Sequence, residues 1–225
     1  MARKNRFAAP GLPYHVVNRG NDRKIVFRQG FDYIAFLELL AEGVGRFDVW
    51  IFGYCLMPNH FHLLIEPRSD GALSAFMQSV TGRYACTLRQ QTQTVGHGHV
   101  FQRRFWNAAI YDDLWFLTVL RYVEANPVRA GLVPAADLWP WSSFTDRAAG
   151  ARKIVSPLPL VLSPRWPELV NAPQSEEVLN TIRSELTHTA GRPKKDAKMG
   201  QAHFGGVGQN CDGIAGSYKI NGSEG

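Results

Sequence analysis

Two runs of β-branched and aromatic residues, joined by a short turn, place the strongest constraint on how this 225-residue chain can fold. Val49–Met57 and His60–Glu66 both have the composition of β-strands. Between them, Met57-Pro58-Asn59 has the composition of a turn. The two runs are therefore predicted to form an antiparallel hairpin.

The segments around this hairpin occur in an order that indicates a fold class. Apolar residues at helical or strand spacing, with turn and capping signals, predict a strand at Leu12–Arg19, helices at Phe31–Gly45 and Leu73–Gln90, a strand at Phe105–Tyr111, and a helix from Asp112 or Asp113 to about Asn126. The order β-α-β-β-α-β-α is that of an α+β, ferredoxin-like split βαβ unit. We expect an antiparallel sheet with helices packed on one face.

The character of the chain changes after Trp139-Pro140-Trp141, where Pro-rich sequence begins. A short helix is predicted at Glu176–Leu186, and the residues after Lys198 are rich in glycine. We predict a main domain over 1–145, a basic accessory arm over 146–197 and a disordered tail over 198–225. The arm and the tail together form an irregular C-terminal extension.

Charge, cysteine content and hydropathy limit the functional class. The chain has 25 Lys and Arg against 19 Asp and Glu, a net charge of +6, which favours a polyanionic partner such as nucleic acid. Three cysteines without CxxC spacing argue against a disulfide scaffold or a zinc ribbon and fit a reducing, cytoplasmic location. No apolar run approaches the ~18 residues of a membrane span, so no membrane partner is expected.

His60 and His62 are the first candidate site residues. Side chains alternate along a strand, so these two imidazoles point to the same face. Neutral imidazole is the commonest protein ligand for metals, and such a pair can hold one divalent ion. The alternative is two histidines on the solvated face of an ordinary strand.

Tyr122 and Asn126 are a second pair of candidate site residues. They occupy positions i and i+4 of a predicted helix and hence lie on one helical face. A phenol can attack a phosphodiester when a cation polarises the phosphate, and the Asn126 amide can give that cation an oxygen ligand. The alternatives are a tyrosine that packs its ring against the sheet, and an asparagine that ends the helix before Pro127.

Basic residues cluster at two places that could contact DNA phosphates, with a further arginine beyond the third helix. The candidates are Arg19, Arg23, Lys24, Arg103, Arg104 and Arg129. Aromatic residues are interleaved with the second cluster, as in single-strand binding sites. We expect Phe105 and Trp106 to belong to the core, because large aromatic side chains are usually buried.

Five stretches of the sequence resemble one family in the family's own order, over roughly residues 10–145. They are YHVVNRGNDRKIVF (14–27), GYCLMPNHFHLLIEP (53–67), VFQRRFWNAAI (100–110), YVEANPVRAGLV (122–133) and WPWSSF (139–144). The chain is similar to the single-tyrosine, HUH-type DNA transposases, and in particular to the REP-associated tyrosine transposases (RAYTs) of bacteria.

This resemblance implies an enzyme, a metal-dependent endonuclease and strand transferase that acts on single-stranded DNA beside palindromic hairpins. It implies His60 and His62 as metal ligands, Tyr122 as the nucleophile that forms a phosphotyrosine intermediate, and Asn126 as a third metal-binding side chain. Mg²⁺ or Mn²⁺ is the implied cofactor, and the working unit is expected to be a monomer or a homodimer.

Two other functions remain open at the level of sequence. The first is a domesticated protein that binds hairpin DNA without transposing it. The second is an RNA-binding protein, because RRM domains share the predicted topology. The strands lack the aromatic signature of an RRM, and such a domain has no use for the two histidines.

Overall fold

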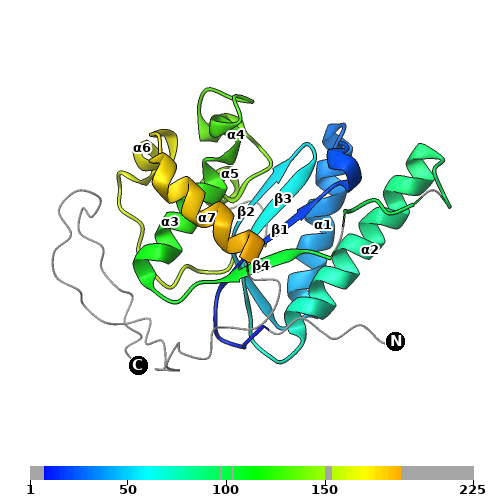
Figure 1. Ribbon diagram of the computed structural model, residues 1–225, viewed down its shortest axis with the longest axis horizontal. Coiled ribbons are helices and arrows are strands. Elements are labelled where there is room, and N and C mark those ends of the chain that lie inside the picture. Colours follow the sequence, from blue (N-terminus) through cyan, green and yellow to red (C-terminus); the bar gives the residue numbers. More distant parts are fainter. Residues whose placement is uncertain (1–7, 97, 103, 150–153, 189–225) are drawn as a thin grey trace.

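The computed structural model describes residues 8–188, apart from 97, 103 and 150–153 (Figure 1). Its first elements are β1 (Tyr14–Arg19), the 3-10 turn η1 (Asn21–Arg23), α1 (Gly30–Arg46), β2 (Val49–Met57), β3 (His60–Pro67) and α2 (Ala72–Thr92). Then follow β4 (Trp106–Ala109), α3 (Asp113–Glu124), α4 (Asn126–Arg129), η2 (Ala136–Leu138), α5 (Ser143–Ala149), α6 (Trp166–Asn171) and α7 (Glu176–His188).

The four strands form one antiparallel sheet in the order β2-β3-β1-β4. β2 and β3 are the predicted hairpin, and β1 pairs with β3 on its other side. In this register Val17 lies opposite His62, and Arg19 lies opposite His60. The α+β class and the split βαβ order are confirmed.

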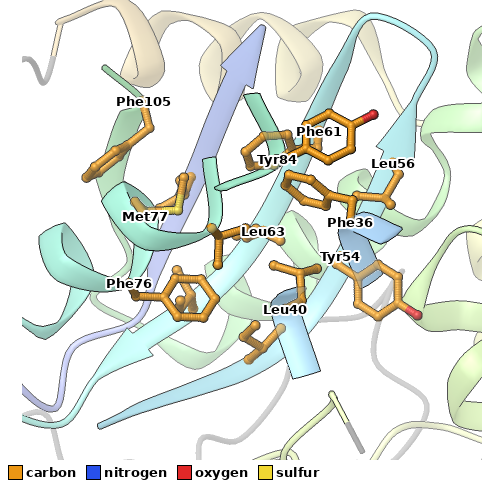
Figure 2. Close-up of a cluster of buried hydrophobic side chains, with 14 of the residues drawn as sticks. Phe36, Leu40, Tyr54, Leu56, Phe61, Leu63, Phe76, Met77, Tyr84 and Phe105 are labelled. Carbon is orange, nitrogen blue, oxygen red and sulfur yellow. The ribbon is translucent and has the colours of Figure 1, made fainter. Parts of the chain in front are cut away.

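One face of the sheet is covered by α1 and α2, and this interface holds the larger apolar core (Figure 2). Phe61 and Leu63 of β3 point into it, because alternate residues of a strand face the same side. Phe36 of α1 and Phe76 of α2 meet them there, all without exposed surface. Burial of aromatic and branched side chains at this density stabilises the sheet and fixes its register.

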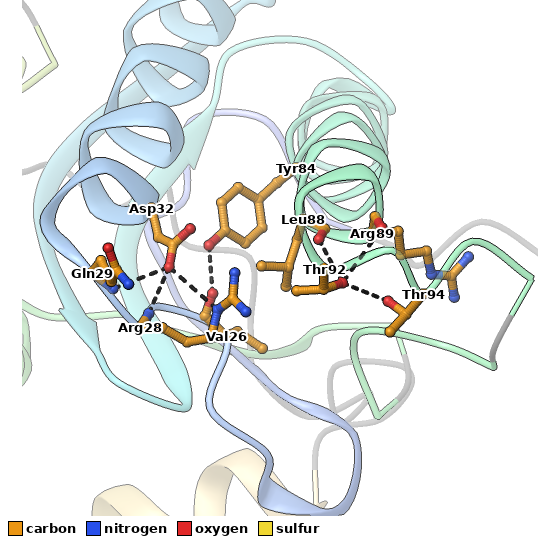
Figure 3. A network of polar contacts seen from close by, with 9 residues as sticks. All are labelled: Val26, Arg28, Gln29, Asp32, Tyr84, Leu88, Arg89, Thr92 and Thr94. Carbon is orange, nitrogen blue, oxygen red and sulfur yellow. Dashed lines mark hydrogen bonds and ion pairs between the residues drawn. The ribbon is translucent and has the colours of Figure 1, made fainter.

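Polar contacts at the start of α1 hold the segment after β1 in place (Figure 3). The buried carboxylate of Asp32 accepts hydrogen bonds from the backbone N–H groups of Arg28 and Gln29. This is the reciprocal cap expected of a residue three places into a helix. The hydroxyl of Tyr84 donates to the carbonyl of Val26, which ties α2 to the same segment.

The predicted helical layer on one face is thus formed by α1 and α2, and further helices cover the other face as well. α3, α5 and α6 build a second core on the opposite face with Phe52, Cys55 and Leu64 of the sheet. The physical reason is that β2 carries apolar side chains on both faces. In a strand that is buried on both faces, the apolar run is nearly continuous rather than alternating.

α5 and α6 are attached to this second core through Glu124, a carboxylate of α3 with no exposed surface. It accepts hydrogen bonds from the hydroxyl of Ser143, the guanidinium of Arg147 and the indole N–H of Trp166. The helix predicted at Glu176–Leu186 is confirmed as α7, which contacts β4. The basic sequence Gly191–Lys195 and the predicted tail 198–225 lie outside the described residues.

Among the residues that the structure describes, no helix combines the length and the apolar character needed to cross a membrane.

Candidate active site

His60 and His62 lie on the face of β3 that α3 covers. Their ring centroids are 5.0 Å apart and their planes are inclined at 78°. The Nδ1 atom of His60 is hydrogen bonded to the side-chain oxygen of Asn59 at 2.6 Å. The His62 ring is buried, whereas His60 is half-buried at the start of the strand. The pair therefore has the shared orientation that its spacing predicted.

His15 of β1 completes this cluster, and sequence reasoning missed it. Its Nε2 atom lies 2.9 Å from the Nδ1 atom of His62, and both rings are buried. The two rings are nearly parallel, with centroids 5.2 Å apart. The hydrogen bond occupies Nδ1 of His62, so Nε2 is the nitrogen that this ring can offer to a ligand.

Burial keeps all three imidazoles neutral. It lowers the pKa of His15 to about 3, helped by the charge of Arg129. Burial, together with Arg19 and Arg129, lowers the pKa of His60 to about 4. The pKa of His62 also lies well below its ordinary value, mainly because its ring is buried. Neutral imidazole is the form that binds metals.

Tyr122 faces this histidine cluster from α3. Its ring centroid lies 5.7 Å from that of His62 and 5.7 Å from that of His15, edge-on in both cases. α3 begins at Asp113, where the carboxylate of Asp112 caps the backbone N–H of Trp115, as expected for one of the two predicted caps. Only 6% of Tyr122 is exposed.

Asn126 and Arg129 lie one and two turns beyond Tyr122. The chain does not leave the helical conformation at Asn126, because a proline is tolerated in the first turn of a helix, and α4 follows directly. The guanidinium of Arg129 lies 4.1 Å from the centroid of the Tyr122 ring, and it donates to Asn126 Oδ1 at 2.6 Å. The Asn126 amide nitrogen donates to the carbonyl of Tyr122.

The other predicted basic residues lie at two places. Arg19 ends β1 beside His60. Arg23 and Lys24 are exposed in the turn that follows, which is held at Asn59 by a hydrogen bond from the Asn59 amide to the Arg23 carbonyl. Asp22 and Arg23 both adopt left-handed backbone conformations there, with φ of 53° and 58°. Such strained conformations concentrate at functional sites.

The second basic cluster precedes β4. Arg104 is exposed on the segment before that strand, whereas Arg103 lies outside the described residues. Phe105 belongs to the core with 6% exposure, and Trp106 is half-buried.

The donors around His60 and His62 fit a divalent cation in part. The two rings are neutral, they face the same space, and each can offer Nε2. The Asn126 oxygen is held by Arg129, so this amide would have to exchange its partner to become a ligand. Among the described residues, no group of three His, Cys, Asp or Glu side chains is arranged to hold a metal. The metal ligands His60, His62 and Asn126 therefore stay a prediction.

Comparison with known proteins places this geometry in a family. A model of the family described as "Transposase IS200 like" matches residues 8–126, more than half of the chain. The chain belongs to this family. The match begins before β1 and ends at Asn126, so it contains His15, both candidate metal ligands and Tyr122. The expectation of an enzyme of the transposase class is confirmed at the level of the family.

Two curated relatives bear the name of the subgroup that the sequence resembles. A Haemophilus influenzae protein, provisionally named as a REP-associated tyrosine transposase, is 31% identical over 98 residues, which are 40% of this chain and 56% of that protein. An Escherichia coli REP-associated tyrosine transposase is 23% identical over 137 residues, 60% of this chain and 76% of the relative. The match thus spans little more than half of the first relative.

The fold of the IS200-like chain also matches a solved structure, that of a REP-associated tyrosine transposase bound to a REP hairpin. The TM-score is 0.53 at 22% identity, over 70% of this chain and 92% of the other. At this identity the likeness establishes the fold.

Proposed function

We propose that this protein cuts and rejoins single-stranded DNA beside hairpins formed by palindromes, as a transposase of the REP-associated type that uses Tyr122 as its nucleophile. The observation that carries the proposal is the convergence of His60, His62 and Tyr122 on one face of the sheet, from segments sixty residues apart. The hairpin substrate is suggested by the ligand of the solved relative.

The reaction would proceed by attack of the Tyr122 hydroxyl oxygen on the phosphorus. A bond forms between these two atoms, and the bond between phosphorus and one sugar oxygen breaks. The phenol loses its proton, and the sugar oxygen gains one and leaves as a free hydroxyl. The products are a phosphotyrosine linkage and a hydroxyl that can later attack that linkage and reseal a strand.

His60 and His62 would hold Mg²⁺ or Mn²⁺ through Nε2, with Asn126 as the proposed oxygen ligand. When bound, the cation supplies Lewis-acid polarisation of the scissile phosphate. The chain's own contribution is orientation: β1 and β3 fix the imidazoles, and α3 fixes the phenol. Arg129 places a positive charge beside the phenol, where it can stabilise the charge that develops on the phosphate.

One chain supplies both the imidazoles and the phenol, which supports a site that needs no second copy. The sequence predicted either a monomer or a homodimer. In both cases each site would contain the same chemical groups, and the two forms would differ in how they arrange the DNA. Arg19, Arg23 and Lys24 lie beside His60 and are proposed to hold the backbone of the DNA.

Incubation with a labelled hairpin oligonucleotide and Mn²⁺ tests the proposal. We expect a covalent adduct that survives denaturing electrophoresis and is lost on adding EDTA. Tyr122→Phe should abolish the adduct and spare hairpin binding, because the substitution removes one hydroxyl from the site. Tight hairpin binding by the wild type without an adduct in Mg²⁺ or Mn²⁺ would instead support the alternative, a domesticated hairpin-binding protein.

A further inference from the structure

The side chain of Asn59 joins a candidate metal ligand to a turn on the surface. Asn59 lies between β2 and β3, and its Oδ1 atom is 2.6 Å from Nδ1 of His60. Its amide nitrogen donates to the backbone carbonyl of Arg23 at 3.2 Å. Asparagine is common in turns because its side chain can bond the backbone of its own turn. Here the side chain bonds instead to a ligand ring and to a different segment, so turn formation alone does not explain these contacts.

The two contacts fix which ring nitrogen of His60 carries the hydrogen. The Arg23 carbonyl can only accept, so the Asn59 amide nitrogen must face it, and the Asn59 oxygen must face the ring. That oxygen also only accepts, which makes Nδ1 of His60 the donor. In a neutral imidazole the other nitrogen then carries the lone pair, so Nε2 is the atom that can bind a cation.

The segment that supplies this carbonyl covers residues 20–27, and we call it the β1 turn. Its backbone is also bound to the turn between β2 and β3. The N–H of Gly20 donates to the carbonyl of Asn59 at 2.8 Å, and the N–H of Val26 donates to the carbonyl of Pro58 at 2.8 Å. The two turns are therefore one hydrogen-bonded unit next to the candidate metal ligand.

The backbone of the β1 turn is tightly folded at the point where Asn59 bonds to it. Asp22 and Arg23 have left-handed conformations, which residues with a side chain keep only when their surroundings hold them there. Gly20 has no room for a side chain, because an added Cβ would lie 2.2 Å from the carbonyl oxygen of Lys24. The side chains of Arg23 and Lys24 are exposed. An anion bound by them would hold the same backbone that the Asn59 amide contacts.

The two candidate ligands thus differ in what orients them. Nδ1 of His62 is bonded to His15, whose ring is buried. Nδ1 of His60 is bonded to a half-buried side chain that also contacts the β1 turn. A ligand histidine binds metal best when the bond of its other nitrogen holds the ring in place. His60 is therefore the ligand whose orientation can respond to DNA.

We propose that Asn59 is a positioning residue that couples DNA at the β1 turn to the cation at His60. DNA phosphates bound by Arg23 and Lys24 hold the turn, the turn holds the Asn59 amide, and the amide holds the His60 ring in the orientation that binds a cation. The inference rests on the proposed function and adds a regulation of that site, in which DNA raises the affinity for the cation. Because such coupling is reciprocal, the cation raises the affinity for DNA by the same factor.

The orientation of the ring can be tested without metal or DNA. Long-range proton–nitrogen NMR spectra distinguish the two neutral forms of a histidine ring, and the His60 signal is assigned by its absence in His60→Gln. We expect the Nδ1–H form in the wild type and in Asn59→Asp, which keeps an oxygen that faces the ring. Asn59→Ala removes that oxygen, so the Nδ1–H form should lose its predominance. An Nε2–H ring in the wild type, or an unchanged ring in Asn59→Ala, would overturn the positioning role.

The coupling can be measured with Mn²⁺ as the probe. Isothermal titration calorimetry gives the Mn²⁺ affinity of the full-length protein with and without a saturating hairpin oligonucleotide, after subtraction of a titration into the hairpin alone. The hairpin is blunt: it has no single-stranded flank for Tyr122 to attack, so no scissile phosphate bridges the DNA and the metal. A change in Mn²⁺ affinity must then pass through the protein.

Asn59→Asp separates the two contacts of this side chain. It keeps an acceptor for the His60 ring and loses the N–H that reaches the Arg23 carbonyl. The matched control is Asn171→Asp in α6. The Asn171 oxygen also accepts a hydrogen bond, and its amide nitrogen also donates to a backbone carbonyl, so this substitution makes the same exchange outside the β1 turn and the histidine cluster.

We expect the hairpin to raise the Mn²⁺ affinity of the wild type at least about fivefold, the lower end of typical coupling between sites. Asn171→Asp should show the same factor. Asn59→Asp should bind Mn²⁺ without DNA at least as well as the wild type, but the hairpin should leave its affinity unchanged. Asn59→Ala should lose about 10–100-fold in Mn²⁺ affinity. Equal Mn²⁺ affinity of the wild type with and without the hairpin, or an undiminished factor in Asn59→Asp, would overturn the proposal.

These outcomes are separable from the fate of the proposed function, because neither measurement depends on cleavage. A protein that forms the Tyr122 adduct while Asn59→Asp keeps the full factor would refute the coupling through Asn59 alone. Coupling that is lost in Asn59→Asp, in a protein whose wild type forms no adduct, would support the role of Asn59 and refute cleavage.

Discussion

A hydrogen bond of 2.9 Å joins Nε2 of His15 to Nδ1 of His62, on the face of the sheet that α3 covers. A ligand histidine is oriented by the bond of its other nitrogen, and loss of that partner typically lowers metal affinity by about 10–100-fold. We therefore expect His15→Ala to weaken Mn²⁺ binding by this factor, measured by isothermal titration calorimetry. His15→Gln should recover part of the affinity. Unchanged Mn²⁺ affinity in His15→Ala would show that this histidine is only a packing residue.

Arg129 is expected to act on the reaction more than on the fold. Its guanidinium lies over the Tyr122 ring and is half-buried, and burial lowers its pKa. Arg129→Ala should lower the single-turnover rate of adduct formation by about 100-fold, the scale of a lost charge-stabilising group. Arg129→Lys keeps the positive charge but cannot stack on the Tyr122 ring as a planar group. Its rate of adduct formation should therefore lie between those of the wild type and Arg129→Ala. A wild-type rate in Arg129→Ala would contradict the role.

Glu124 should dominate the stability of the second core. It is fully buried and accepts from Ser143, Arg147 and Trp166. Glu124→Ala removes the partner of a largely buried arginine, which typically costs about 3–5 kcal/mol in the free energy of unfolding. Urea denaturation measures this loss. The control is Glu168→Ala, which breaks an exposed ion pair with Arg165 and should leave the urea midpoint nearly unchanged.

Hairpin binding should weaken steeply with added salt, because each neutralised phosphate releases counterions. Arg23→Ala and Lys24→Ala should each reduce the slope of log affinity against log salt by about 1. Arg46→Ala is the control, since this arginine ends α1 and stacks on Phe47, on the other side of the sheet. Slopes identical to the wild type in both turn variants would place the DNA elsewhere.

The order of elements was predictable because strand and helix periodicities are local signals. The hairpin of Val49–Met57 with the strand that begins at His60 was predicted to within one residue, and the cap at Asp112 was one of two candidates. The second helical layer was not predicted. The sequence signal for this layer is that apolar and polar residues do not alternate around Cys55 and Leu64. Such an apolar run indicates burial on both faces of a strand, but it does not identify the elements that cover the second face.

The geometry of the candidate site was predictable only where it depends on local periodicity. The shared face of His60 and His62 follows from the period of a strand, but the position of Tyr122 against them depends on how α3 packs on the sheet. His15 could have been found by pairing the first strand with the hairpin, as the split βαβ order implies. A lone buried histidine, however, has no local pattern that distinguishes a positioning residue from a packing one.

The most direct test of the central claim is to map the amino acid that becomes linked to DNA. Wild-type protein is incubated with a labelled, flanked hairpin and Mn²⁺, digested, and the DNA-linked peptide is sequenced by mass spectrometry. The account predicts a single linkage at Tyr122, beside the histidines. Linkage instead to Tyr111, which is 50% exposed and chemically more accessible, or no linkage at all, would contradict it.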